Sequence, residues 1–104
     1  MEITNQDWKL FRQRLPGWQE AHMDRLNRAY AEILAGAGKP SVKFWTLEKR
    51  IREDKHRPGV QLQLKRSELV CTLAILLNDG VITPNDLKGF SDGLLTSLSM
   101  LLHL

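Results

Sequence analysis

The sequence predicts an all-α fold: a compact bundle of five or six helices in a single helical domain covering residues 1–104. Apolar residues recur at helical spacing through most of the chain, and residues typical of helix caps and helix ends separate the apolar segments. No two segments show the apolar–polar alternation expected of a pair of β-strands. With 42% hydrophobic and 26% charged residues, the 104-residue chain can bury one core.

The N-terminal third predicts two helices. The first covers about residues 6–15, with Thr4 or Asn5 available as its cap, and Pro16 is expected to break it or bend it sharply. The second covers about residues 18–35, and the segment GAGKP that follows is typical of a helix end.

The middle of the chain predicts a third helix and then an extended segment. The helix covers about residues 42–55 and can be capped by Ser41. One side of this helix is apolar, with Phe44, Leu47 and Ile51. Apolar residues then alternate with glutamines, which predicts a short extended connector near 58–65 rather than a strand within this chain.

The C-terminal third holds the most apolar segments. A fourth helix is expected over about residues 68–78 with Ser67 as cap, a short fifth over about residues 84–88, and a sixth from Ser91 to the C-terminus. We expect the fourth and sixth helices to form the central apolar pair, with the second and third packed against them. The apolar runs are too short to cross a membrane.

Several kinds of chemistry are disfavoured by the residues present. The single cysteine excludes an intrachain disulfide and fits a cytoplasmic location, while the three dispersed histidines disfavour a metal site. The turn NDGVITPND is similar to half of a calcium-binding loop, but two of its ligand positions would fall on Ile75 and Leu77. No local catalytic signature is present, so we expect neither an enzyme nor a cofactor.

The one functional signal is the basic middle of the chain. Residues 43–66 hold eight Lys or Arg against three acids, whereas the rest of the chain holds seven against nine. This predicts a binding or regulatory module that acts through a protein partner, with a homodimer as one option. The alternatives are a nucleic-acid-associated protein that uses the same bases on phosphates, and a merely solvated face. The candidate contact residues are Trp45, Lys49, Arg50, Arg52, Lys55, Arg57, Lys65 and Arg66.

Three sequence blocks resemble a group of short bacterial proteins of unassigned activity. They are LPGWQEAHMDRLNRAY, FWTLEKRIREDKHRPGV and LLNDGVITPNDLKGFSDGL, and the resemblance covers most of the chain, about residues 15–102. The resemblance implies a bacterial, cytoplasmic, helical protein and no catalytic residues. Some members are labelled multidrug transporters, a label that the short apolar runs of this sequence argue against.

Overall fold

The computed structural model describes residues 3–103, and within this range it contains four α-helices, two 3-10 helices and no strand. The elements in chain order are α1 (Asn5–Ala35), α2 (Pro40–Asp54), η1 (Arg66–Glu68), α3 (Leu69–Asn78), η2 (Pro84–Leu87) and α4 (Asp92–Leu102). The all-α prediction is confirmed. The predicted count of five or six helices is wrong, because the first two predicted helices are one and the short fifth is a 3-10 turn.

The long helix α1 begins at a capping box and continues through Pro16. Thr4 Oγ1 accepts a hydrogen bond from the Asp7 backbone N–H at 2.9 Å, and the Asp7 carboxylate accepts one from the Thr4 N–H at 3.2 Å. Thr4 is therefore the cap. Pro16 cannot donate to the carbonyl of Arg12, but both residues are exposed, so water can reach that carbonyl. The predicted break at Pro16 is therefore absent.

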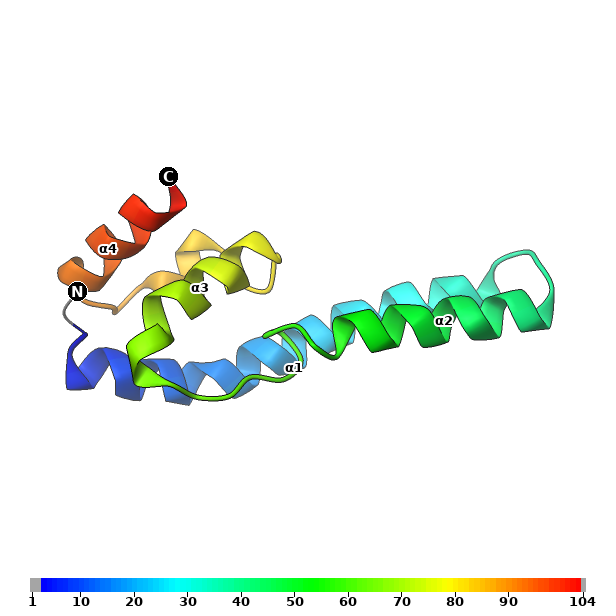
Figure 1. The fold of residues 1–104 in the computed structure, drawn as a ribbon, viewed down its shortest axis with the longest axis horizontal. Helices are drawn as coiled ribbons and strands as arrows, with labels where there is room; N and C mark the ends of the chain where they lie inside the picture. Colours follow the sequence, from blue (N-terminus) through cyan, green and yellow to red (C-terminus); the bar gives the residue numbers. More distant parts are fainter. Residues whose placement is uncertain (1–2, 104) are drawn as a thin grey trace.

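The core lies between α3, α4 and the first half of α1, and we call this part of the molecule (residues 3–21 and 66–103) the head. The helices α3 and α4 pack directly on each other, as expected for the central apolar pair (Figure 1). The buried apolar side chains are Phe11, Leu15, Leu69, Val70, Leu73, Ala74, Leu76, Val81, Ile82, Leu87, Phe90, Leu94 and Leu98. None of them lies between Leu15 and Leu69.

A buried carboxylate joins the two ends of the head. Asp7 accepts hydrogen bonds from the Ser91 N–H at 2.8 Å and the Ser91 hydroxyl at 2.6 Å, and Ser91 Oγ in turn accepts from the Leu94 N–H at the start of α4. Burial acts to raise the pKa of Asp7, but the hydrogen bonds from Ser91 and Thr4 outweigh it and leave this pKa lowered. The Asp7 carboxylate therefore contacts the capping residues of both helices, Thr4 of α1 and Ser91 of α4.

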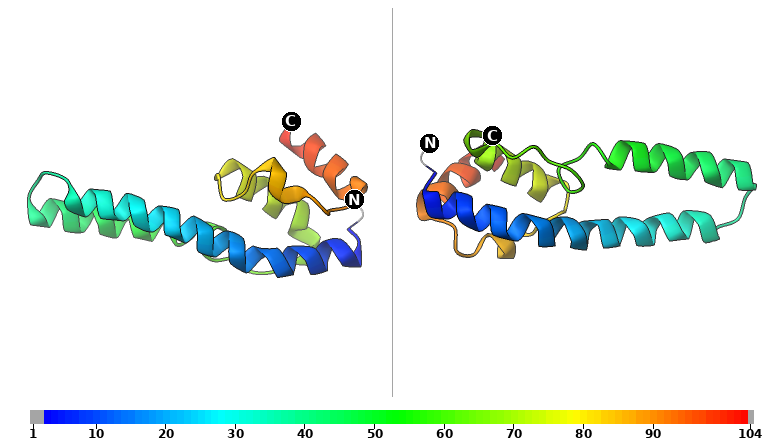
Figure 2. Two further views of the ribbon diagram at one scale, coloured as in Figure 1. Left: turned by 180° about the vertical axis from the view of Figure 1, so that it is seen from behind. Right: turned by 90° about the horizontal axis from the view of Figure 1, so that it is seen from below.

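The second half of α1 and the whole of α2 form a hairpin that extends beyond the head (Figures 1 and 2), and we call residues 22–54 the arm. The chain measures 52 × 28 × 23 Å, and its radius of gyration is 16.5 Å. A compact domain of this length would have a radius of about 13 Å. The prediction of a compact bundle is therefore wrong, and so is the expected packing of the third predicted helix on the central pair, because α2 buries no residue.

Residues 55–65 connect the arm back to the head and run beside α1 (Figure 2). Residues 61–65 form neither helix nor strand, as expected for an extended connector. Leu62 packs against the core, whereas its neighbours Gln61 and Gln63 are exposed. In the part of the chain that is described, no helix combines the length and the apolar character needed to cross a membrane.

Candidate docking surface on the helical arm

The arm carries apolar side chains that the chain itself leaves uncovered. Five of the nine large apolar residues that are exposed in the structure lie on it: Leu34, Val42, Phe44, Trp45 and Ile51. A soluble chain scatters single apolar residues over its surface, but a group of them on one projecting element marks an interaction site.

Polar contacts hold the hairpin together. Tyr30 on α1 donates its hydroxyl hydrogen to the Asp54 carboxylate on α2, and Arg50 Nε lies 3.3 Å from the same carboxylate. At the other end, Lys43 Nζ donates to the carbonyl of Leu34 at 3.0 Å. Burial and then the Asp54 hydrogen bond raise the pKa of Tyr30 to about 12. These contacts fix the two helices side by side without an enclosed core.

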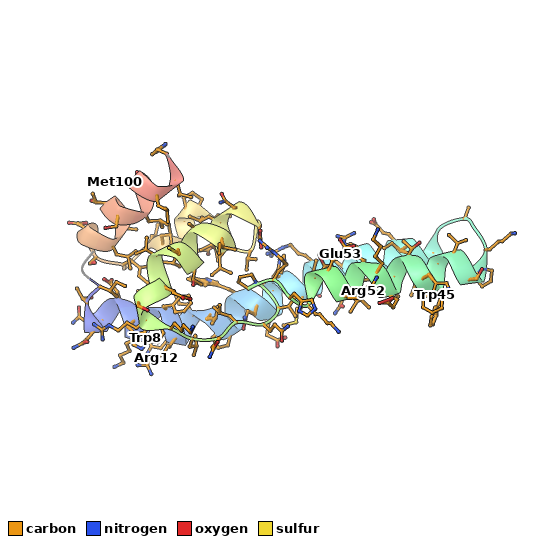
Figure 3. All side chains as sticks on the ribbon, in the orientation of Figure 1. Trp8, Arg12, Trp45, Arg52, Glu53 and Met100 are labelled. Carbon is orange, nitrogen blue, oxygen red and sulfur yellow. The ribbon has the colours of Figure 1, made fainter. Side chains whose placement is uncertain are left out.

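The outermost part of the arm is centred on Trp45, whose side chain is 63% exposed and points away from the head (Figure 3). Val42 and Lys49 border a shallow hollow of about 400 Å³ beside it. Arg52 lies seven residues further along α2 and so on the same side as Trp45. We call Val42, Trp45, Lys49 and Arg52 the Trp45 surface.

Trp8 is a weaker candidate than Trp45 for a residue that contacts a partner. It is partly buried against the core, and its ring is stacked on Phe11 with a centroid distance of 5.9 Å. The guanidinium of Arg12 lies 5.6 Å from the centre of the Trp8 ring (Figure 3). Trp8 is therefore engaged within the head, whereas Trp45 is available to a partner.

The junction of arm and head contains a charged cavity of about 380 Å³. Its lining residues are His22, Leu26, Arg50, Glu53, Asp54, Arg57 and Asp79. Arg57 donates two hydrogen bonds to the Asp79 carboxylate, at 2.8 and 2.9 Å, which raises the pKa of Arg57. Nδ1 of His22 is buried without a hydrogen-bond partner, and burial, followed by the nearby Arg25, lowers the pKa of His22. This cavity joins two parts of the chain by charge pairing, and no group of three metal-ligating side chains occurs among residues 3–103.

The eight residues predicted as a contact surface do not form one patch. Trp45, Lys49 and Arg52 come together on the arm, while Lys55 borders a groove on another side of α2 and Lys65 lies exposed in the connector.

Three of the arginines are engaged in contacts that hold the fold. Arg50 contacts Asp54, Arg57 contacts Asp79, and Arg66 donates to the side chain of Asn5 and to the carbonyl of Ile3 at the opposite end of α1. Arg52 lies 3.6 Å from Glu48 on an exposed helix surface, a contact that contributes little.

The exposed Phe44 and Ile51 were not anticipated as surface residues, since their spacing is also that of a core-facing stripe. Comparison with protein families, with curated proteins and with solved structures found no match. The resemblance to short bacterial proteins therefore stays a prediction, and the function has to be argued from the surface of the arm.

Proposed function

We propose that the protein is a small non-enzymatic binding module whose Trp45 surface takes up a protein partner, and that the partner presents an apolar site flanked by acidic residues. One observation carries this proposal: α2 is amphipathic, yet none of its residues is buried in the chain that contains it. An amphipathic helix that finds no core in its own chain is suited to bury its apolar side chains against another molecule.

The residue types of the Trp45 surface fit a protein interface. Tryptophan and arginine are enriched among the residues that dominate binding energy, because large side chains lose much water-exposed area in a well-packed contact. Lys49 and Arg52 flank Trp45, and residues 36–55 hold six bases against three acids. This excess of positive charge favours an acidic partner and speeds its approach.

The same bases are poorly arranged for nucleic acid. Binding to phosphates uses a stripe of free Lys and Arg side chains that follows the backbone of the nucleic acid. In this protein Arg57 is held by Asp79 beside the head and Arg66 by Asn5 at the start of α1. The remaining bases are spread over the arm and the connector, which favours the protein partner.

The proposal can be tested with a defined probe, a fluorescently labelled helical peptide with leucines at i, i+3, i+4 and i+7 and glutamates on both flanks. Fluorescence anisotropy of this peptide with the full chain should show saturable binding. Trp45→Ala should weaken that binding by about tenfold or more, since it removes the central apolar anchor. The double change Lys49→Glu, Arg52→Glu should weaken it as well, because it reverses the flanking charge.

Met100 offers the matched control. It is 67% exposed on α4, far along the chain from the arm, so Met100→Ala removes a comparable exposed apolar side chain without touching the Trp45 surface (Figure 3). The proposal fails if Trp45→Ala and Met100→Ala behave alike, or if a peptide with lysine flanks binds as well as the glutamate peptide. A DNA duplex that binds better than the peptide, with a steep loss at higher salt, would point to the nucleic-acid alternative.

A further inference from the structure

The head carries a group of bases of its own, on the side of α1 away from α3 and α4. Asn5, Lys9 and Arg12 follow one another at intervals of four and three residues, so they share one side of α1, and all three are exposed. Arg66 donates to the side chain of Asn5 at 2.6 Å, and Lys65 precedes it in the connector. Figure 3 shows Arg12 below α1, opposite to α3 and α4. We call Lys9, Arg12, Lys65 and Arg66 the basic face.

The connector holds the two halves of the basic face side by side. Near the arm, Gln19 Nε2 on α1 donates to the carbonyl of Pro58 at 2.9 Å. At the other end, Arg66 donates to the carbonyl of Ile3 at 2.9 Å. Between these two contacts the chain runs along the lower edge of α1 (Figures 1 and 2). The bases of α1 and those of the connector therefore belong to one elongated surface.

The positive charge of the basic face is not neutralised by ion pairs. Among residues 3–103, the bases that form ion pairs are Arg28, Arg50, Arg52 and Arg57, all on the arm or in the connector beside it. The acceptors of Arg66 are uncharged oxygens. Residues 1–19 hold three bases and two acids, and residues 60–67 hold two bases and no acid. One of the two acids, Asp7, is buried, so the surface is strongly positive.

The surface around these bases is polar and uncharged. Gln13 follows Lys9 by four residues and lies beside it on α1. In the connector, Gln61 and Gln63 flank Leu62, and because Leu62 packs against the core, its two neighbours face outward. Amide side chains, together with Lys and Arg, are among the groups that contact the phosphates and sugars of nucleic acids. The composition therefore fits a phosphate backbone.

Two other anionic partners fit this surface less well. A helix that lies on a membrane buries several apolar side chains in the lipid, but Leu64 is the one large apolar residue in residues 3–19 and 60–67 that is exposed. Proteins that bind single strands stack the bases on free aromatic rings. The ring of Trp8, beside Arg12, is already stacked on Phe11 and covered by the Arg12 guanidinium. A duplex, which presents its backbone rather than its bases, is the better match.

We propose that the basic face binds the phosphate backbone of a nucleic-acid duplex, of DNA or RNA, without reading its sequence. Lys9 and Lys65 supply exposed charges from the two halves of the face, and the Trp8 ring holds the Arg12 guanidinium between them. The Trp45 surface lies on the arm and is not part of this contact (Figure 3). The duplex and the protein partner proposed for Trp45 therefore use separate surfaces, and either proposal can fail without the other.

The first test is the fluorescence anisotropy of labelled duplexes of about 20 base pairs, one of DNA and one of RNA, titrated with the full chain. Between 50 and 200 mM salt the binding should weaken by about a hundredfold, because four neutralised phosphates release their counterions. Such binding of either duplex supports the proposal, and the tighter of the two identifies the nucleic acid. The proposal fails if neither duplex binds at 50 mM salt, if salt has no effect, or if the chain binds vesicles of anionic phospholipid and neither duplex.

A pair of charge reversals tests the place of binding. Lys9→Glu with Lys65→Glu removes one base from each half of the face and should weaken duplex binding by about tenfold or more. Helicity by circular dichroism should remain, since both side chains are exposed. The matched control is Lys39→Glu with Lys88→Glu, which changes the net charge equally at exposed positions elsewhere and should weaken binding by less than about twofold. Equal losses in the two double variants would contradict the assignment to the head.

Exchanging the probes separates this proposal from the one made for Trp45. The chain with Lys9→Glu and Lys65→Glu should still bind the glutamate-flanked helical peptide, because both changes lie outside the arm. Loss of the duplex alone therefore reports on the basic face. Duplex binding that is lost with Lys49→Glu, Arg52→Glu and kept with Lys9→Glu, Lys65→Glu would place the phosphates on the arm and overturn the assignment.

Discussion

The head and the arm are built from similar amphipathic helices, but only the head has an interior. In the head, α3 and α4 close over the first half of α1, and residues such as Leu73 and Leu94 are fully buried. In the arm, α2 has only the second half of α1 beside it and buries no residue. Two helices share a single strip of contact, and a third element is needed to enclose a core. The apolar side of an amphipathic helix is therefore buried in the head, where three helices pack together, and stays exposed in the arm, where only two do.

The largest expected effect comes from a change at the centre of the head. Leu73→Ala should lower the free energy of unfolding by about 2–5 kcal/mol, because it leaves a cavity at a site that is 0% exposed. Val42→Ala, at an exposed position of the arm, should change it by less than about 0.5 kcal/mol. Urea unfolding of both variants measures the contrast. Similar losses would mean that the arm holds an interior of its own.

A smaller effect is expected where the connector meets the two regions. A Cβ atom on Gly59 would lie 2.5 Å from Cδ2 of His22 and 2.7 Å from Cγ2 of Val81, closer than side-chain contacts allow. Gly59→Ala should therefore cost about 1–3 kcal/mol, since one of these neighbours has to move.

Gly17 is the matched control for Gly59. It lies inside α1, and a Cβ atom there meets nothing within 4 Å. Gly17→Ala should therefore stabilise the protein, by roughly 0.5–1 kcal/mol, because alanine loses less conformational freedom in a helix. Thermal unfolding of the two variants should give shifts of opposite sign, and a stabilising Gly59→Ala would contradict the close packing at this junction.

The smallest effect is a pH dependence that arises from His22. Burial, followed by the charge of Arg25, lowers the pKa of His22 below its ordinary 6.5, although Asp54 and Asp79 act in the other direction. The folded chain thus binds the His22 proton more weakly than the unfolded chain does. Protonation of His22 therefore favours the unfolded chain, so the stability that neutral His22 allows is present above pH 6.5 and is lost as the pH falls below that value. Urea titrations on either side of pH 6.5 should show a shallower loss for His22→Gln than for the wild type.

The sequence predicted the head better than the arm, because the head depends on local signals. Ser91 caps α4, Asp86 and Thr83 cap the short η2 turn, and the apolar runs of α3 and α4 pair as expected. Pro16 was misleading, because a proline inside a helix removes one hydrogen bond, and α1 continues through Pro16 on its exposed side despite that loss. Which side of α1 faces solvent depends on where α3 and α4 pack on it, and the local sequence around Pro16 does not contain that information.

The arm could not be predicted from the same kind of pattern. Phe44 and Ile51 have the spacing of a core-facing stripe whether or not anything covers them. The bases of residues 43–66 are close in sequence. Arg57, however, donates a hydrogen bond to Asp79 and Arg66 donates one to Asn5, and both acceptors are distant in the chain. The candidate site is therefore only partly the basic segment that the charge count indicated.

The continuity of α1 has a geometrical consequence for the arm. The helix belongs to both regions and has 31 residues, a length of about 46 Å. Because an α-helix turns about 100° per residue, the direction in which Trp45 faces relative to the α3–α4 pair is set by helical phase. One alanine inserted into α1 between the head and the arm would turn the whole arm by that angle, whereas an insertion of seven would lengthen it and leave its direction nearly unchanged. The number of residues in α1 therefore sets both how far the arm extends from the head and the direction in which Trp45 faces.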